Sequence, residues 1–198
     1  VFLPMLNKQY TSMLQEKDVI FEIFQYATER AKVVGAENIY DFSLGNPSVP
    51  APSIVNETIV QKVNTLDPLA LHGYSPSFGI METREKIAVF LNKKYGSSYK
   101  ASNIFMAIGA AGALAHAFRA VTNPGDEIIT FAPCFSEYKP YTAGAGLKLT
   151  IIPADIDTFQ INFAAFEAQL NENTTAVLIN SPNNPSGIVY STETIKKL

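Results

Sequence analysis

The stretch TAVLINSPNNPSG, residues 175–187, decides how this sequence is interpreted. Its first five residues are apolar or β-branched, which predicts a buried strand over 175–179. Prolines at 182 and 185 and a glycine at 187 end that strand and begin a fixed loop. Asn183 and Asn184 therefore lie where a strand ends, and their amides can both donate and accept hydrogen bonds. The same loop is also compatible with a turn that only connects a strand to a helix.

Upstream of this stretch, strands and helices are predicted to alternate. Strands are expected over 104–108, 127–131 and 147–152, and helices over 110–121, over 136–143 and after the capping residue Asn162. Nearer the start, we expect amphipathic helices over 19–34 and 80–95, a helix over 54–63 and a strand over 39–44. The alternation predicts an α/β fold, a three-layer, mostly parallel sheet flanked by helices. In such sheets, ligands bind at the carboxyl ends of the strands.

The composition predicts an ordinary globular chain. It has 198 residues, of which 47% are hydrophobic and 17% charged, and its net charge is −3. We therefore expect no nucleic-acid partner and no polybasic membrane site. No apolar stretch approaches the roughly 18 residues that a membrane-spanning helix needs. The single cysteine, Cys134, suits a reducing, cytoplasmic location, and two histidines make a metal site improbable.

Two further segments carry residue types that suit ligand binding. Gly109-Ala110-Ala111-Gly112 joins a predicted strand to a helix, whose free N–H groups would favour a phosphate. The alternative is a small-residue turn that lets the helix and the sheet pack closely. Phe135 follows another strand and could lie against a flat ring, although it and Tyr138 are equally compatible with the core.

The last residues predict a helix with Ser191 as its N-cap and Glu193 in its first turn. That helix reaches only Leu198, about two turns on. We therefore expect a fragment that lacks the rest of its sheet domain, with a natural frayed C-terminal helix as the alternative.

Six motifs in this order resemble the class I/II aminotransferases, aspartate aminotransferase-like enzymes of the fold type I pyridoxal-phosphate (PLP) architecture. They are FSLGNP at 42–47, Tyr74 with Gly79 and Arg84, GAAGAL at 109–114, NPGDE at 123–127, APCFSEY at 132–138, and NSPNNPSG at 180–187. The resemblance implies that residues 1–37 form an N-terminal arm and helix belonging to a small domain. It implies that residues 38–198 form a PLP-binding large domain, incomplete at its C-terminus.

The resemblance also implies roles in binding the cofactor pyridoxal 5′-phosphate. Gly109 would make the turn, and Ala110 and Ala111 would offer backbone N–H groups to the phosphate. Phe135 would stack on the pyridine ring. Asn184 would donate a hydrogen bond to the phenolic oxygen of that ring.

Two further positions gain roles in binding the substrate and a second subunit. The Gly45 backbone and Asn184 would seat the substrate carboxylate. Tyr74 would reach the cofactor phosphate of the other subunit, which implies a homodimer with its sites at the interface.

The activity implied is amino transfer between an amino acid and a 2-oxo acid, within amino-acid metabolism. No catalytic residue is expected within the chain. The family's Schiff-base lysine, the acidic partner of its ring nitrogen and its carboxylate-binding arginine all follow the last motif, beyond Leu198. The 198 residues alone are therefore expected to be inactive.

Two alternatives remain for the activity. One is a PLP-dependent lyase of the same fold, either a C–S lyase or an aminocyclopropane-carboxylate (ACC) synthase-like enzyme. The other is a non-enzymatic aminotransferase-like domain of a transcription regulator. Such regulators carry an N-terminal DNA-binding helix-turn-helix. Residues 1–37 argue against this alternative, because they contain one amphipathic helix and no basic recognition helix.

Overall fold

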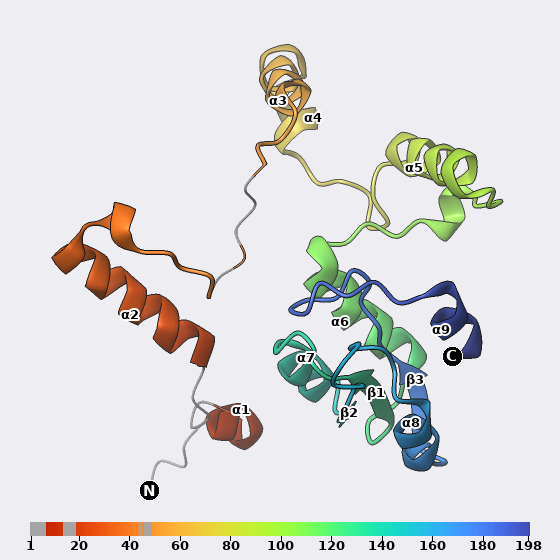
Figure 1. The fold of residues 1–198 in the computed structure, drawn as a ribbon. Coiled ribbons are helices and arrows are strands. Elements are labelled where there is room, and N and C mark those ends of the chain that lie inside the picture. The colour runs from red at the N-terminus through yellow and green to blue at the C-terminus, as the bar shows by residue number, and fades with distance from the viewer. Residues whose placement is uncertain (1–6, 14–18, 44, 46–48) are drawn as a thin grey trace, which may run out of the picture. The chain divides into compact units, whose positions relative to one another are not determined.

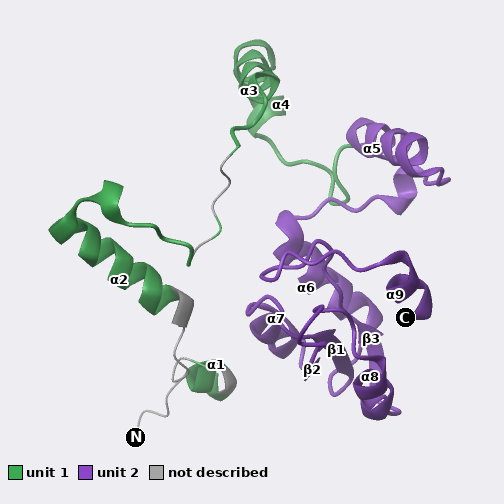
Figure 2. Cartoon of the chain, viewed as in Figure 1, with its two compact units in different colours: residues 1–80 green, residues 81–198 purple. Residues whose placement is uncertain are grey.

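The structure is a computed structural model, which describes residues 7–13, 19–43, 45 and 49–198. The chain divides into two compact units, Val1–Ile80 and Met81–Leu198 (Figure 2). None of the described helices is long and apolar enough to cross a lipid bilayer.

The first unit is helical. Its elements are α1 (Lys8–Met13), α2 (Val19–Val34), the 3-10 turn η1 (Ala36–Asn38), α3 (Ser53–Thr65) and α4 (Pro68–His72). The strand predicted over 39–44 is wrong for residues 39–43, and residue 44 lies outside the described residues. Ile39 does have extended backbone, with φ −106° and ψ 121°. A strand also needs a neighbour to pair with, and the described part of the chain supplies none there.

The second unit contains the predicted α/β sheet (Figure 1). Its elements are α5 (Met81–Tyr95), η2 (Ala101–Asn103), α6 (Gly109–Val121), β1 (Glu127–Phe131), α7 (Tyr138–Gly144), β2 (Lys148–Ile152), α8 (Phe163–Gln169), β3 (Thr174–Val177) and α9 (Thr192–Lys197). The strand predicted over 104–108 is wrong, for the same reason as the one over 39–44. Ile104 is extended, with φ −104° and ψ 120°, but no described strand pairs with this segment.

Local capping signals fix where several helices begin. The Asn162 side chain accepts a hydrogen bond from the Ala165 N–H (3.0 Å) at the start of α8. The Ser191 hydroxyl accepts one from the Thr194 N–H (3.0 Å) at the start of α9. Both caps confirm the sequence predictions, because an N-cap oxygen satisfies a helix N–H that has no partner within the helix.

The sheet is parallel, with β1 between β2 and β3. In the register, Ile129 is opposite Thr150 of β2 and Val177 of β3. All five residues of β1 are buried, as expected for a central parallel strand covered on both faces.

Alternate residues of the strands build two separate cores. On one face, Ile128 and Leu149 pack with Phe118 of α6 and with Tyr141 of α7. On the other face, Ile129, Phe131 and Ile152 pack with Phe166 of α8 and with Tyr190. Helices thus cover both faces of the sheet, which confirms the predicted three-layer α/β fold.

A buried carboxylate joins the amino ends of the strands. Glu127 is only 2% exposed, and its carboxylate pairs with the Lys148 ammonium. It also accepts hydrogen bonds from Thr150 Oγ1 (2.9 Å) and Asn171 Nδ2 (2.9 Å). Lys148 is the main reason why the pKa of Glu127 lies below its usual range, and these hydrogen bonds add to the effect against the opposing effect of burial.

Replacing Glu127 with glutamine is expected to lower the free energy of unfolding by about 1.5–3 kcal/mol at neutral pH, since charged hydrogen bonds are lost. The folded carboxyl has a lowered pKa, so its stabilisation is complete above the unfolded pKa of about 4.3. It is lost as the pH falls through the folded pKa. Urea unfolding should therefore show a smaller difference in the free energy of unfolding between the wild type and Glu127→Gln at pH 3 than at pH 7.

The matched control is Glu167→Gln, the same change at an exposed position of α8. We expect it to alter the free energy of unfolding by no more than about 0.5 kcal/mol. A Glu127→Gln effect that stayed constant between the two pH values would show that the charge of Glu127 contributes nothing.

Candidate functional site

Two loops with predicted site residues leave the same edge of the sheet. The β1 loop, residues 132–137, follows β1, and the β3 loop, residues 178–190, follows β3. Because β1 and β3 are parallel neighbours, their carboxyl ends meet at one edge. This is the edge where ligands bind in open α/β sheets.

Asn183 connects the two loops. Its side chain is 8% exposed, and its Nδ2 donates to the Pro133 carbonyl oxygen at 2.8 Å. Its backbone N–H donates to the Ile188 carbonyl (2.9 Å), and its own carbonyl accepts from the Gly187 N–H (2.7 Å). The β3 loop is therefore closed on itself and attached to the β1 loop. Sequence reasoning placed Asn183 at the end of a strand but assigned it no role.

Asn184 differs from its neighbour in its surroundings. It is exposed, and its backbone N–H donates to Asn180 Oδ1 at 2.8 Å. Within the described part of the chain, its side-chain amide has no hydrogen-bond partner. The loop thus fixes the backbone of Asn184 and leaves its amide available to a ligand, as donor and acceptor.

Phe135 is the aromatic residue of the β1 loop. It is half-buried, and its ring lies edge-to-face against Tyr138, with 5.7 Å between centroids and 85° between planes. Tyr138 is 7% exposed and begins α7, so it belongs to the core. Of the two interpretations of this pair, core packing holds for Tyr138, and Phe135 lies at the edge of that core.

Cys134 stands in the chain between Pro133, which accepts the hydrogen bond from Asn183, and Phe135. Burial raises the pKa of the Cys134 thiol, so it stays protonated near neutral pH. A protonated thiol is a poor nucleophile. Across the described ranges, no cluster of three or more His, Cys, Asp or Glu residues has the arrangement of a metal site.

The start of α6 offers unoccupied backbone donors. Gly109 begins the helix with φ +64°, in the left-handed region that favours glycine. Ile108 precedes it and provides no side-chain cap, and the Gly112 N–H donates to the Ile108 carbonyl at 3.2 Å. The N–H groups of Gly109, Ala110 and Ala111 have no acceptor among the described residues. Together with the helix dipole, they suit an anion.

Gly45 and Tyr74 lie in the other compact unit, where both are exposed. The structure therefore brings Asn184 and Phe135 onto one edge of the sheet. It places Gly109, Ala110 and Ala111 at the start of a helix in the same unit.

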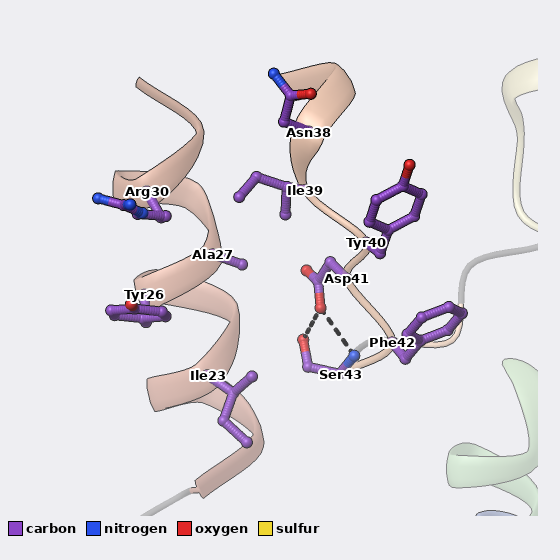
Figure 3. Close-up of a pocket in the computed structure, with 10 residues that line it drawn as sticks. All are labelled: Ile23, Tyr26, Ala27, Arg30, Asn38, Ile39, Tyr40, Asp41, Phe42 and Ser43. Carbon is purple, nitrogen blue, oxygen red and sulfur yellow. Dashed lines mark hydrogen bonds between the residues drawn. The ribbon is translucent and has the colours of Figure 1, made fainter. Parts of the chain in front are cut away.

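Just before Gly45, the chain lines a groove of about 500 Å³ that sequence reasoning did not anticipate (Figure 3). Residues of α2 line one side, with the Ile23 and Ala27 side chains pointing toward residues 38–43, which line the other. The Asp41 carboxylate accepts from the Ser43 hydroxyl (2.6 Å) and the Ser43 N–H (2.8 Å). These hydrogen bonds hold the pKa of Asp41 below its usual range and fix the backbone over residues 41–43.

Comparison with known proteins points to one family. The family model described as aminotransferase class I and II matches residues 36–198. The chain is 33% identical over 173 residues to an aspartate aminotransferase of Thermotoga maritima, an alignment that covers 87% of this chain and 45% of that protein.

Solved structures agree. An aminotransferase from Eubacterium rectale is 50% identical with a TM-score of 0.91, over 98% of this chain and 49% of that one. The aspartate aminotransferase of Thermus thermophilus, with maleate, superposes with a TM-score of 0.83 over 98% of this chain and 49% of that one. Its identity is 24%, so this likeness concerns the fold alone. The chain spans about half the length of the relatives it matches.

Proposed function

The chain belongs to the aminotransferase class I and II family, and from this premise we propose that the protein is a PLP-dependent aminotransferase. It would transfer an amino group between an amino acid and a 2-oxo acid. The observation that carries the proposal is the family match over residues 36–198, which includes the whole of the second unit. The exposed Asn184 amide and the open start of α6 support it, because their chemistry suits this cofactor.

The available groups fit the parts of pyridoxal phosphate one by one. The N–H groups of Ala110 and Ala111, at the positive end of α6, would bind the phosphate, and Gly109 would give them their direction. The Phe135 ring would lie against the pyridine ring. The Asn184 amide would donate to the phenolic oxygen. When bound, the cofactor supplies an electron sink for the reaction, and the protein supplies binding, orientation and electrostatics.

Gly45, Asn184 and Tyr74 would bind the substrate and a second subunit. At Gly45, an added Cβ would meet no described atom within 4 Å, so a carboxylate could approach the backbone there. Asn184 would bind the same carboxylate. The fully exposed Tyr74 would donate to the cofactor phosphate of a partner subunit in a homodimer.

The remaining assignments follow the same premise. Residues 1–37 would belong to a small domain and residues 38–198 to the cofactor-binding large domain. The lysine that holds the cofactor would lie outside these residues, since no lysine among them stands in a matching motif. The 198 residues alone would then be inactive. One cysteine in the chain suits a cytoplasmic location.

Reductive trapping tests the proposal. The purified protein is incubated with pyridoxal phosphate, reduced with borohydride, and analysed by intact mass and peptide mapping. We expect one pyridoxyl group per chain, on a lysine outside residues 1–198, because a positioned lysine reacts far faster than exposed ones. A urea-unfolded sample serves as the control for random labelling.

Two results would contradict the proposal. One is a protein whose mass is well above 21.6 kDa and which carries no specific adduct. The other is a stoichiometric adduct on a lysine within residues 1–198. A product assay then distinguishes the reaction class: a 2-oxo acid with equal amino transfer indicates an aminotransferase, and released ammonia or a ring product indicates a lyase.

A further inference from the structure

One side chain makes the hydrogen bond that links the two loops at the carboxyl edge of the sheet. Asn183 and Pro133 are 50 positions apart, and the Asn183 Nδ2 donates to the Pro133 carbonyl at 2.8 Å. Among the described residues, this is the only hydrogen bond between the β1 loop and the β3 loop. We propose that Asn183 is a positioning residue, which sets the spacing between Phe135 and Asn184 and so shapes the slot for the cofactor ring. This inference rests on the proposed function.

Asn183 is well placed to transmit its position to Asn184. Three hydrogen bonds fix it, two through its backbone and one through its side chain. The adjacent Asn184 N–H is fixed in turn by Asn180 Oδ1 at 2.8 Å. The Asn184 backbone can therefore shift only if these bonds rearrange.

On the other loop, Pro133 is two residues before Phe135. The Phe135 carbonyl accepts from the Tyr138 N–H at 3.2 Å, and the two rings are in edge-to-face contact. Phe135 is thus held from the α7 side by Tyr138, and its loop is held from the β3 side by Asn183. Removing the second attachment would take away the one hydrogen bond that links the β1 loop to the β3 loop among the described residues.

The chemistry of the attachment requires a donor. The Pro133 carbonyl can only accept, and a half-buried carbonyl that loses its partner costs free energy. Asn183→Asp keeps the size and shape of the side chain but replaces the NH₂ group with a second acceptor oxygen. Asn183→Gln keeps the amide donor on a chain that is longer by one methylene.

The test measures the affinity of the apo-protein for pyridoxal phosphate, and the visible circular dichroism per bound cofactor. We expect Asn183→Asp to weaken the affinity about 10-fold or more and to reduce the dichroism, since the ring is no longer held in one orientation. Asn183→Gln should recover part of both. Asn173→Asp, the same change at the opposite end of β3, should leave both as in the wild type.

A second variant distinguishes the loss of cofactor positioning from a general loss of stability. Ile152→Val weakens the neighbouring core and should lower the melting temperature by about 2–4 °C without changing the cofactor affinity. At a temperature where both variants are folded, Asn183→Asp should lose more cofactor affinity than Ile152→Val. If Asn183→Asp and Asn173→Asp bind the cofactor equally, the inference fails and the proposed function stands. If the wild type binds no pyridoxal phosphate, the proposed function fails and the inference with it.

Discussion

Replacing Asn184 with alanine is expected to lower kcat/KM for amino transfer by about 10- to 150-fold. In the proposed site, its amide donates to the phenolic oxygen of the cofactor and helps bind the substrate carboxylate. Hydrogen bonds to charged groups contribute about 1.5–3 kcal/mol each, which corresponds to this range. Steady-state kinetics with the donor and acceptor that the wild type uses would measure the effect.

Asn184→Ala should hardly change the stability of the folded protein. Asn184 is exposed, and within the described residues its side chain has no hydrogen-bond partner, so the melting temperature should stay within about 2 °C of the wild type. Asn184→Asp is the matched variant, because it has the same shape but no N–H donor and places a charge beside the oxygen. It should lose at least as much activity as Asn184→Ala. Full activity in either variant would remove Asn184 from the site.

The position of Asn184 could be predicted from sequence because its determinants are local. An apolar, β-branched run predicts the strand, and Pro182, Pro185 and Gly187 set where it ends. The helix caps Asn162 and Ser191 are local in the same way, since each bonds an N–H three residues further on.

The errors came from features that depend on distant partners. Residues 104–108 have the composition of a strand, but a strand exists only where another strand pairs with it. The same holds for residues 39–43. The composition of a segment shows that it is apolar. It does not show whether another strand will pair with it.

The roles of Asn183 and Glu127 also depend on long-range contacts. Asn183 bonds a residue 50 positions away, and Glu127 bonds Asn171, 44 positions away. In the sequence, Asn183 and Asn184 are equivalent amides, and the fold makes one a buried connector and the other an exposed donor. A buried strand that begins with a glutamate was the one available sign that a partner such as Lys148 must exist.

Replacing Phe131 with alanine is expected to have the largest effect on stability, a loss of about 3–5 kcal/mol in the free energy of unfolding. Phe131 is 2% exposed at the end of the central strand β1. Its ring packs edge-to-face on Phe166 of α8, with 5.5 Å between centroids. The substitution removes that contact and leaves a cavity between the sheet and α8, which a parallel strand held on both sides cannot close.

Urea unfolding followed by circular dichroism would measure the loss. Phe131→Leu should cost less than Phe131→Ala, since it fills most of the cavity. Ile151→Thr, at an exposed position of the neighbouring strand β2, should cost no more than about 0.5 kcal/mol. Because β1 ends at Phe131 and the β1 loop begins at the next residue, this core also supports the loop that carries Phe135. Equal stability of Phe131→Ala and Ile151→Thr would show that α8 does not pack on the sheet as described.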